Sequence, residues 1–232
     1  MCGDREGIYL GFDPGGYGKF GVAIIDGNCV KASTVSTVDD AMKWAVDECK
    51  ARAREPIAAG IDTLLHWATG RGGWRPCDQQ LRAKYPDVVN KIVAPNSLFG
   101  AMAIGGMALA FRLRQKWSGL VLNETHPKVL LHALGHGYDP KDSESVETAI
   151  RCFTRRGDYT EPNIKTEHEL DAALSAWATQ KGLAEDWVDI VGDRNNLLFP
   201  AGDVRYLWCE ALEPCDVSFL SDSIPQVAGG SE

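Results

Sequence analysis

Four acidic side chains stand where predicted strands end or a predicted helix begins. Asp13, Asp62 and Glu124 each close a predicted strand, and Asp171 lies near the start of a long predicted helix. Loops and helix starts converge at the strand ends of an open α/β sheet, so ligands and metals are commonly held there. One such acid alone is more typical of a turn or a cap. Four of them at corresponding places predict a carboxylate cluster.

Clustered carboxylates repel one another, and a divalent cation between them relieves that repulsion. Hard oxygen ligands with room for water and phosphate favour Mg²⁺ or Mn²⁺. His168 lies three residues before Asp171, so both side chains share one face of the helix. Its imidazole is either a base that orients or deprotonates a water or an ordinary helix-start residue. Glu124 is either a metal ligand or the partner of a nearby lysine.

The elements that must position these acids follow from hydrophobic patterning. Alternating apolar residues predict a strand over 7–13, and two further strands over 18–25 and 28–35 are predicted on either side of a hairpin turn at Asp26-Gly27. A helix follows from Thr37 to the region of Arg54. The next strand, 57–62, is apolar without alternation, which is typical of a central strand that runs parallel to the first.

The second half of the chain is predicted to be mainly helical. A loop rich in glycine, arginine and tryptophan precedes it, and the remaining elements are a helix from 96 or 97 to 117, a strand over 119–124, and helices over 126–134, 143–155 and 167–181. Thr166 and Glu169 form a capping box for the last helix. The order predicts an α/β fold: a mixed five-stranded sheet, with a three-strand antiparallel meander and two parallel strands, flanked by helices. We expect one domain over 1–222 and a flexible tail over 223–232.

Composition is that of an ordinary globular protein, with 232 residues, 44% hydrophobic and 24% charged. No apolar run reaches the roughly 18 residues of a membrane span, and the charged start lacks the apolar segment of a secretory signal. We therefore expect a cytoplasmic protein. The seven cysteines are scattered and form no CxxC pair, which favours free thiols over a zinc ribbon. The sequence leaves the oligomeric state open, a homodimer included.

The net charge of −8 hides a strong asymmetry along the chain. Residues 50–116 hold eleven basic and four acidic side chains, whereas residues 161–232 hold four basic and fourteen acidic ones. The basic segment is either an anion-binding face or a solvated helix surface. Candidate nucleic-acid contacts, which combine cationic and flat aromatic groups, are Lys19, Arg71, Trp74, Arg75 and Arg82. Trp74 can equally belong to the core, and the glycines before Lys19 can be simple turn formers.

Several motifs resemble a known superfamily. The segment GFDPGGYGKFGVAII resembles the first hairpin of RNase H-like nucleases, in particular RuvC-like Holliday-junction resolvases, and His168-Glu169-Leu170-Asp171-Ala172 is similar to their His-x-x-Asp-Ala motif. The segments GID at 60–62, RPCDQQLR at 75–82, NETHP at 123–127 and ELDAALSAW at 169–177 are similar to a family of predicted RNase H-like nucleases without an established function. Asp78 and Arg82 of this sequence match a polar motif of that family. The resemblance covers about residues 7–182.

The resemblance implies a metal-dependent nuclease that cuts DNA or RNA. Asp13 would bridge two cations, Asp62 and Asp171 would each complete the shell of one, and Glu124 would lie nearby. Two other functions stay open. An actin-like ATP-dependent sugar or acid kinase also begins with a strand-Asp-x-Gly hairpin but needs two copies of the fold, and a binding module could retain the fold without catalysis.

Overall fold

The structure is a computed structural model of the chain. It describes residues 7–69, 73–92, 100–136, 139, 141–160, 162–185 and 187–210. Three predicted features therefore lie outside the described residues: the start of the helix at 96 or 97, the side chain of Arg71 and the tail over 223–232.

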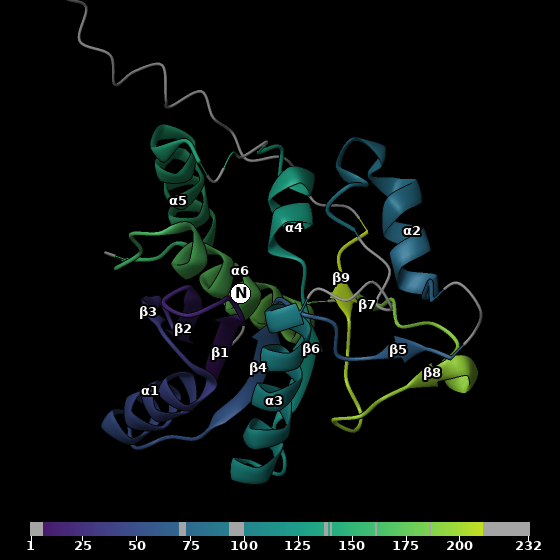
Figure 1. The fold of residues 1–232 in the computed structure, drawn as a ribbon. Coiled ribbons are helices and arrows are strands. Elements are labelled where there is room, and N and C mark those ends of the chain that lie inside the picture. The colour runs from purple at the N-terminus through teal and green to yellow at the C-terminus, as the bar shows by residue number, and fades with distance from the viewer. Residues whose placement is uncertain are drawn as a thin grey trace, which may run out of the picture.

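A mixed five-stranded sheet forms the centre of the protein, with the strand order β3-β2-β1-β4-β6 (Figure 1). Its strands are β1 (Ile8–Asp13), β2 (Phe20–Asp26), β3 (Cys29–Val35), β4 (Pro56–Ile61) and β6 (Val121–Glu124). The first three pair antiparallel as a meander. Strand β4 pairs parallel to β1, and β6 pairs parallel to β4. The predicted α/β architecture and its arrangement of strands are thus confirmed.

Helices cover both faces of this sheet and divide the core in two. One apolar cluster lies between the sheet and the helices α1 (Val38–Ala51) and α3 (Gly100–Lys116). The other lies beneath α4 (Pro127–Ala133), α5 (Ser143–Gly157) and α6 (Glu167–Ala184). Helix α1 begins as predicted, because the Thr37 side chain accepts a hydrogen bond from the Asp40 backbone N–H. Alternate residues of the central strands belong to the two clusters, because successive side chains of a strand point to opposite faces of the sheet.

Several short elements are absent from the prediction. They are α2 (Pro76–Lys84), the 3₁₀ turns η1 (Pro86–Val88) and η2 (Arg194–Asn196), and the strand pairs β5 (Trp67–Ala68) with β8 (Leu197–Leu198) and β7 (Val188–Asp189) with β9 (Leu207–Trp208). A two-residue strand is too short to show alternation, and α2 buries only Cys77 and Leu81 among its apolar residues. The short strands pair with segments farther along the chain, whereas α2 begins on local signals, with Pro76 in its first turn and Asp78 accepting a hydrogen bond from the Arg75 backbone N–H.

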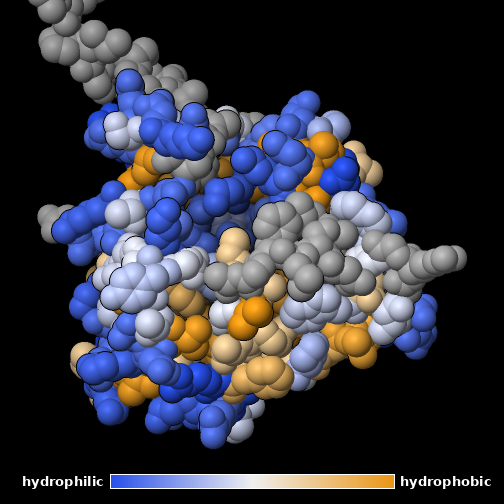
Figure 2. Space-filling model, in the orientation of Figure 1, coloured by the Kyte–Doolittle hydropathy of each residue, from blue (hydrophilic) through white to orange (hydrophobic). Residues whose placement is uncertain are grey.

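None of the described helices is both long enough and apolar enough to cross a bilayer. Exposed apolar side chains do gather over α3, where Ile104 and Phe111 face solvent (Figure 2). Among the described residues, the cysteines at 29, 49, 77, 152 and 209 form no disulfide.

Helix α6 crosses the sheet in unusually close contact with its backbone. A Cβ atom added at Gly11 of β1 would collide with the carbonyl oxygen of Ala172, and one added at Gly60 of β4 would collide with that of Ser175. Gly11 and Gly60 are neighbours across the β1–β4 pairing. Two adjacent strands therefore lack side chains where the helix passes, and this lets α6 lie directly on the sheet.

This close contact predicts a large cost for a single methyl group. We expect Gly60→Ala to destabilise the fold by about 1–3 kcal/mol or more, because backbone atoms of α6 must move away. Gly119→Ala is the matched control, since no atom lies within 4 Å of the position of its added Cβ. Urea unfolding followed by circular dichroism measures both variants. Equal stability of the two would contradict the close packing of α6.

Candidate metal centre

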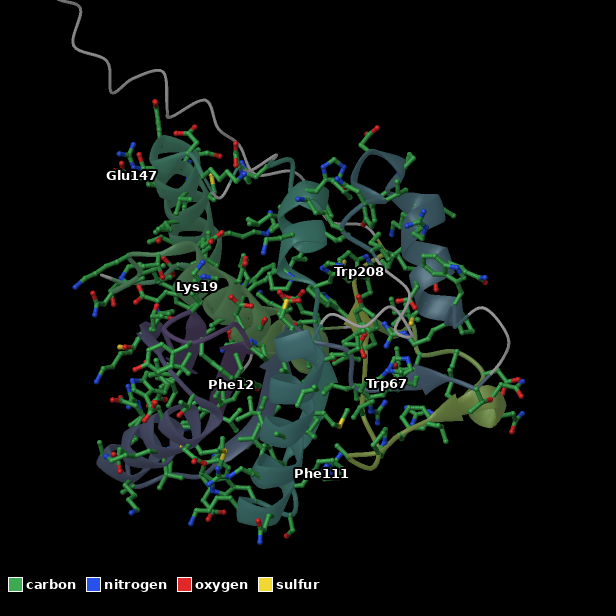
Figure 3. All side chains as sticks on the ribbon, in the orientation of Figure 1. Phe12, Lys19, Trp67, Phe111, Glu147 and Trp208 are labelled. Carbon is green, nitrogen blue, oxygen red and sulfur yellow. The ribbon has the colours of Figure 1, made fainter. Side chains whose placement is uncertain are left out.

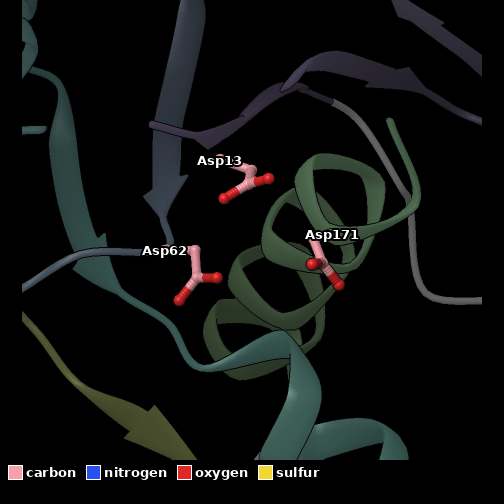
Figure 4. Close-up of side chains that lie close together, drawn as sticks. All are labelled: Asp13, Asp62 and Asp171. Carbon is pink, nitrogen blue, oxygen red and sulfur yellow. The ribbon is translucent and has the colours of Figure 1, made fainter. Parts of the chain in front are cut away.

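Three buried carboxylates meet at one edge of the sheet. Asp13, Asp62 and Asp171 each place a carboxylate oxygen so that the three atoms lie within 4.8 Å of one another (Figure 4). Their exposed fractions are 4%, 8% and 0%. Of the four acids grouped by the sequence, these three come together in one cluster.

Three different elements deliver these side chains. Asp13 is the last residue of β1, and Asp62 follows β4, where its backbone N–H donates to the carbonyl oxygen of Phe12 at 2.9 Å. Asp171 belongs to α6. The helix is fixed in its place by Ser175, whose hydroxyl donates to the Asp171 carbonyl oxygen at 2.9 Å and accepts from Thr125 at 2.8 Å. The end of β6 is thereby tied to the turn of α6 that carries the acid.

Two basic side chains contact the cluster from its rim. The ring nitrogen Nδ1 of His168 lies 2.7 Å from Oδ2 of Asp13. The ammonium of Lys128 lies 3.1 Å from Oδ2 of Asp171, and the lysine side chain is 31% exposed. The other carboxylate oxygen of Asp171, Oδ1, is buried and has no hydrogen-bond partner among the described residues. The cluster thus retains an unsatisfied anionic oxygen at its centre.

Burial and mutual repulsion change the acidity of these groups. Burial, and then the neighbouring Asp13 carboxylate, raise the pKa of Asp62 well above its ordinary value. Burial also raises the pKa of Asp171 to about 7, although Lys128 opposes the rise. The hydrogen bond to Asp13 raises the pKa of His168. The two carboxyl groups therefore resist ionisation until positive charge is supplied.

The cluster fits a divalent cation. Its donors are carboxylate oxygens, which Mg²⁺ and Mn²⁺ prefer, and one of them lacks any other partner in the described structure. A bound cation would satisfy Oδ1 of Asp171 and offset the repulsion that raises the pKa of Asp62. The residues able to hold it are the same three that the sequence singled out.

Glu124 lies outside the cluster and belongs to a buried ion network. Its carboxylate contacts the Arg75 guanidinium at 2.7 Å and His66 at 2.9 Å, and it accepts a hydrogen bond from the Leu65 backbone N–H at 2.8 Å. Burial alone would raise the pKa of Glu124, but Arg75 and His66 lower it to about 2. The nearby positive charge is an arginine and not the lysine considered from the sequence. Glu124 is fully occupied within the protein.

Arg75 is placed differently from the sequence expectation. The sequence suggests an exposed loop residue that grips nucleic acid, whereas the side chain is 1% exposed. Its guanidinium forms a bidentate pair with Asp78, at 2.9 and 2.7 Å, in addition to its contact with Glu124. A guanidinium buried among two carboxylates offers no free donor to a phosphate. Arg75 therefore ties the start of α2 to the end of β6.

The same network contains a thiol, an imidazole and a carboxylate in a row. The Sγ atom of Cys77 lies 3.6 Å from Nε2 of His66, whose Nδ1 atom faces Glu124. All three residues are buried, and burial strongly raises the pKa of the Cys77 thiol. The sulfur therefore stays protonated and has no access to a substrate, so this row is a structural element.

The other predicted nucleic-acid contacts have varied surroundings. Lys19 is exposed in the turn between β1 and β2. Figure 3 shows Lys19 in the left half of the view and Trp67 of β5 in the right half. Trp74 is 39% exposed, and the Arg82 guanidinium lies 4.8 Å from the centre of its ring. Arg82 also donates to the carbonyl oxygens of Val89 and Ile92 at 2.6 and 2.7 Å. Arg82 thus holds its own loop together, while Lys19 and Trp74 keep exposed surface.

Sequence reasoning missed Lys128. Helix α4 starts three residues after β6 ends, so its first turn must lie at the same edge as the acids. This spacing was the available signal. Burial would lower the pKa of the Lys128 ammonium, but Asp171, Asp62 and Asp13 raise it above its ordinary value. The lysine is thus a fixed positive charge beside the cluster.

The raised pKa of Asp171 predicts a pH-dependent stability. A carboxyl with an ordinary pKa of 3.8 and a folded-state pKa of about 7 stabilises the fold below pH 4, and this contribution is lost as the pH rises to about 7. Asparagine cannot ionise, so Asp171→Asn avoids the cost of a buried charge. In EDTA at pH 8 this variant should therefore melt several degrees higher than the wild type, at roughly 2–4 °C per kcal/mol of unfolding free energy. Near pH 4 the difference should largely vanish.

Thermal unfolding with and without Mn²⁺ measures this effect. Mn²⁺ should raise the melting temperature of the wild type more than that of Asp171→Asn. The control is Asp47→Asn, which removes an exposed acid of α1 and should bring no gain at pH 8. A lower melting temperature for Asp171→Asn at pH 8 would show that Asp171 is a structural cap.

The buried ion network predicts a structural role for Arg75. Arg75→Met leaves Asp78 and Glu124 buried without their positive partner, and we expect a loss of about 3–5 kcal/mol. Arg112→Met, on the exposed surface of α3, should cost less than about 1 kcal/mol. Urea unfolding compares the two variants. Normal stability with weakened nucleic-acid binding in Arg75→Met would instead support a direct contact.

Comparison with known proteins gives one distant structural likeness. No protein-family model matches the chain. No curated protein matches it either. The chain is similar to the solved structure of RuvC from Thermus thermophilus, with 16% sequence identity and a TM-score of 0.39, over 76% of this chain and 96% of that one.

Proposed function

We propose that this protein is a divalent-metal-dependent nuclease that hydrolyses phosphodiester bonds in DNA or RNA. The observation that carries the proposal is the cluster of Asp13, Asp62 and Asp171, whose oxygens lie within 4.8 Å of one another in a buried position. Such a cluster is costly for a fold unless a cation occupies it. The sequence motifs that hold these acids point to the same activity.

The three carboxylates would together bind two cations. Asp13, on the central strand β1, would contact both, while Asp62 and Asp171 would each contact one. Mg²⁺ or Mn²⁺ in this place would supply Lewis acidity to a phosphate and lower the pKa of a bound water. The rigid sheet and the close-packed α6 would keep the ligand oxygens in position.

Two further side chains have roles in this proposal. His168 would share a proton at Nδ1 with Asp13, and its Nε2 atom, which lies 3.6 Å from Oε1 of Glu167, would orient an attacking water or, in the neutral ring, accept its proton. Lys128 combines its contact to Asp171 with a partly exposed side chain, so its ammonium would contact a phosphate oxygen of the substrate. Lys19 and Trp74 would contribute backbone and base contacts at the periphery.

The kinase alternative has no supporting observation. It requires two copies of the meander-containing sheet, and residues 7–210, so far as they are described, form one such sheet with two short strand pairs. A binding module without catalysis is distinguished from the nuclease by experiment.

The test is metal-dependent cleavage of labelled single-stranded, duplex, hybrid and branched nucleic acids. The wild type should cut at least one of them with Mg²⁺ or Mn²⁺ and none in EDTA. Asp13→Asn should lose activity by at least about 100-fold, since it removes the shared ligand. Its melting temperature should not fall.

Asp47→Asn is the matched control, because it removes a carboxylate that faces solvent and should cut at the wild-type rate. Cleavage that survives Asp13→Asn would disprove the proposed site. A protein that binds nucleic acid and Mn²⁺ but cuts no substrate would be a binding module.

A further inference from the structure

A cavity of about 310 Å³ opens beside the carboxylate cluster. It lies at the ends of β4 and β6, and α3 and α4 contribute to its walls. Asp62 and Lys128 line it and also belong to the cluster or contact it. The cavity and the candidate metal centre are therefore continuous, and one molecule could occupy both.

The lining of the cavity combines charged and apolar side chains. Asp62, Lys91 and Lys128 supply charged surface, with Asp62 and Lys128 beside the cluster, whereas Leu64, Ile92 and Ala103 supply apolar surface. Arg75, Asp78 and Glu124 also reach the wall, but their charges are paired with one another. A ligand that fits has one anionic end, directed at the metal centre, and one flat or apolar end without net charge.

One unsatisfied polar group lies in the wall. His126 lines the cavity, and its Nε2 atom lies 3.0 Å from the carbonyl oxygen of Lys91, so Nε2 carries the hydrogen. Nδ1 is consequently an acceptor, and it is buried without a partner among the described residues. Burial lowers the pKa of His126 to about 4, which agrees with a neutral ring. Because Nδ1 has almost no accessible surface, His126 presents its neutral ring to the cavity.

The size of the cavity limits its occupant. A volume of about 310 Å³ is at the lower end of the range of small-molecule sites, roughly 300–1,000 Å³, and has room for a single base and its sugar. A base pair within a continuous helix cannot enter, because its hydrogen-bonding edge and both its faces are occupied. Enzymes that act on a single base accept unpaired or extruded nucleotides for this reason.

We propose that this cavity binds the base of one unpaired nucleotide while a phosphate of that nucleotide lies at Asp13, Asp62 and Asp171. The base would pack against Leu64, Ile92 and Ala103 and against the neutral ring of His126. The inference rests on the proposed nuclease and specifies its substrate: a strand with an unpaired nucleotide at the scissile phosphate, in preference to continuous duplex.

The test uses binding as well as cleavage. The Asp13→Asn protein, whose changed residue does not line the cavity, is titrated with an oligonucleotide that carries one 2-aminopurine, either single-stranded or in a full duplex. Unstacking of the base into the cavity should raise its fluorescence in the single strand, and the duplex should bind at least about 10-fold more weakly.

A second substitution tests the cavity itself. Ala103→Trp, added to Asp13→Asn, fills the cavity and should weaken single-strand binding at least about 10-fold and remove the fluorescence rise. Ala108→Trp is the control on the same helix, because Ala108 is exposed and does not line the cavity. His126→Ala removes the ring from the wall of the cavity, and it should also reduce the fluorescence rise. Melting temperatures confirm that each variant is folded.

The outcomes separate this inference from the proposed function. Wild-type protein that cuts continuous duplex as fast as single strand, with folded Ala103→Trp and His126→Ala variants that bind normally, would overturn the cavity inference and leave the nuclease intact. Binding that depends on Ala103 and His126 without any metal-dependent cleavage would support the cavity and overturn the nuclease.

Discussion

The direct contact between α6 and the sheet is the constraint on which the site depends. Gly11 and Gly60 leave adjacent strands bare at the place where the helix crosses, and the carbonyl oxygens of Ala172 and Ser175 occupy the space that side chains would fill. Because the helix lies so close, Asp171 reaches the ends of β1 and β4. With ordinary side chains at these positions, α6 would lie farther from the sheet and the three carboxylates would not meet.

Two buried acidic groups of this protein illustrate opposite solutions to the same electrostatic problem. Glu124 is surrounded by Arg75, His66 and a backbone N–H, and its pKa falls to about 2. Asp171 has one lysine and a bare oxygen, and its pKa rises to about 7. The charge of Glu124 is compensated by its partners, which also hold β6 to α2. The carboxylate of Asp171 keeps one oxygen without a partner, and such a buried acid is what a metal centre requires.

Local patterns in the sequence determined most of the sheet and grouped the three acids that meet, although they also grouped Glu124, which belongs to a separate ion network. Period-two alternation and the Asp26-Gly27 turn predicted the meander, and the apolar run before Asp62 predicted a central parallel strand. Because parallel strands end at one edge, Asp13 and Asp62 had to be near each other. The His168 and Asp171 spacing placed both on one helix face, and the structure has His168 against Asp13. These inferences succeed because backbone periodicity is a local property.

Only the tertiary structure decided which charges pair and which stay free. In the sequence, Arg75 and Glu124 are 49 positions apart, and nothing local shows that they neutralise each other in the core. Lys128 becomes part of the site because α4 begins at the edge where β6 ends. The cavity beside Asp62 exists between elements that are remote in the chain. Charge pairing and empty volume depend on distances between segments, and a linear sequence does not contain those distances until the chain has folded.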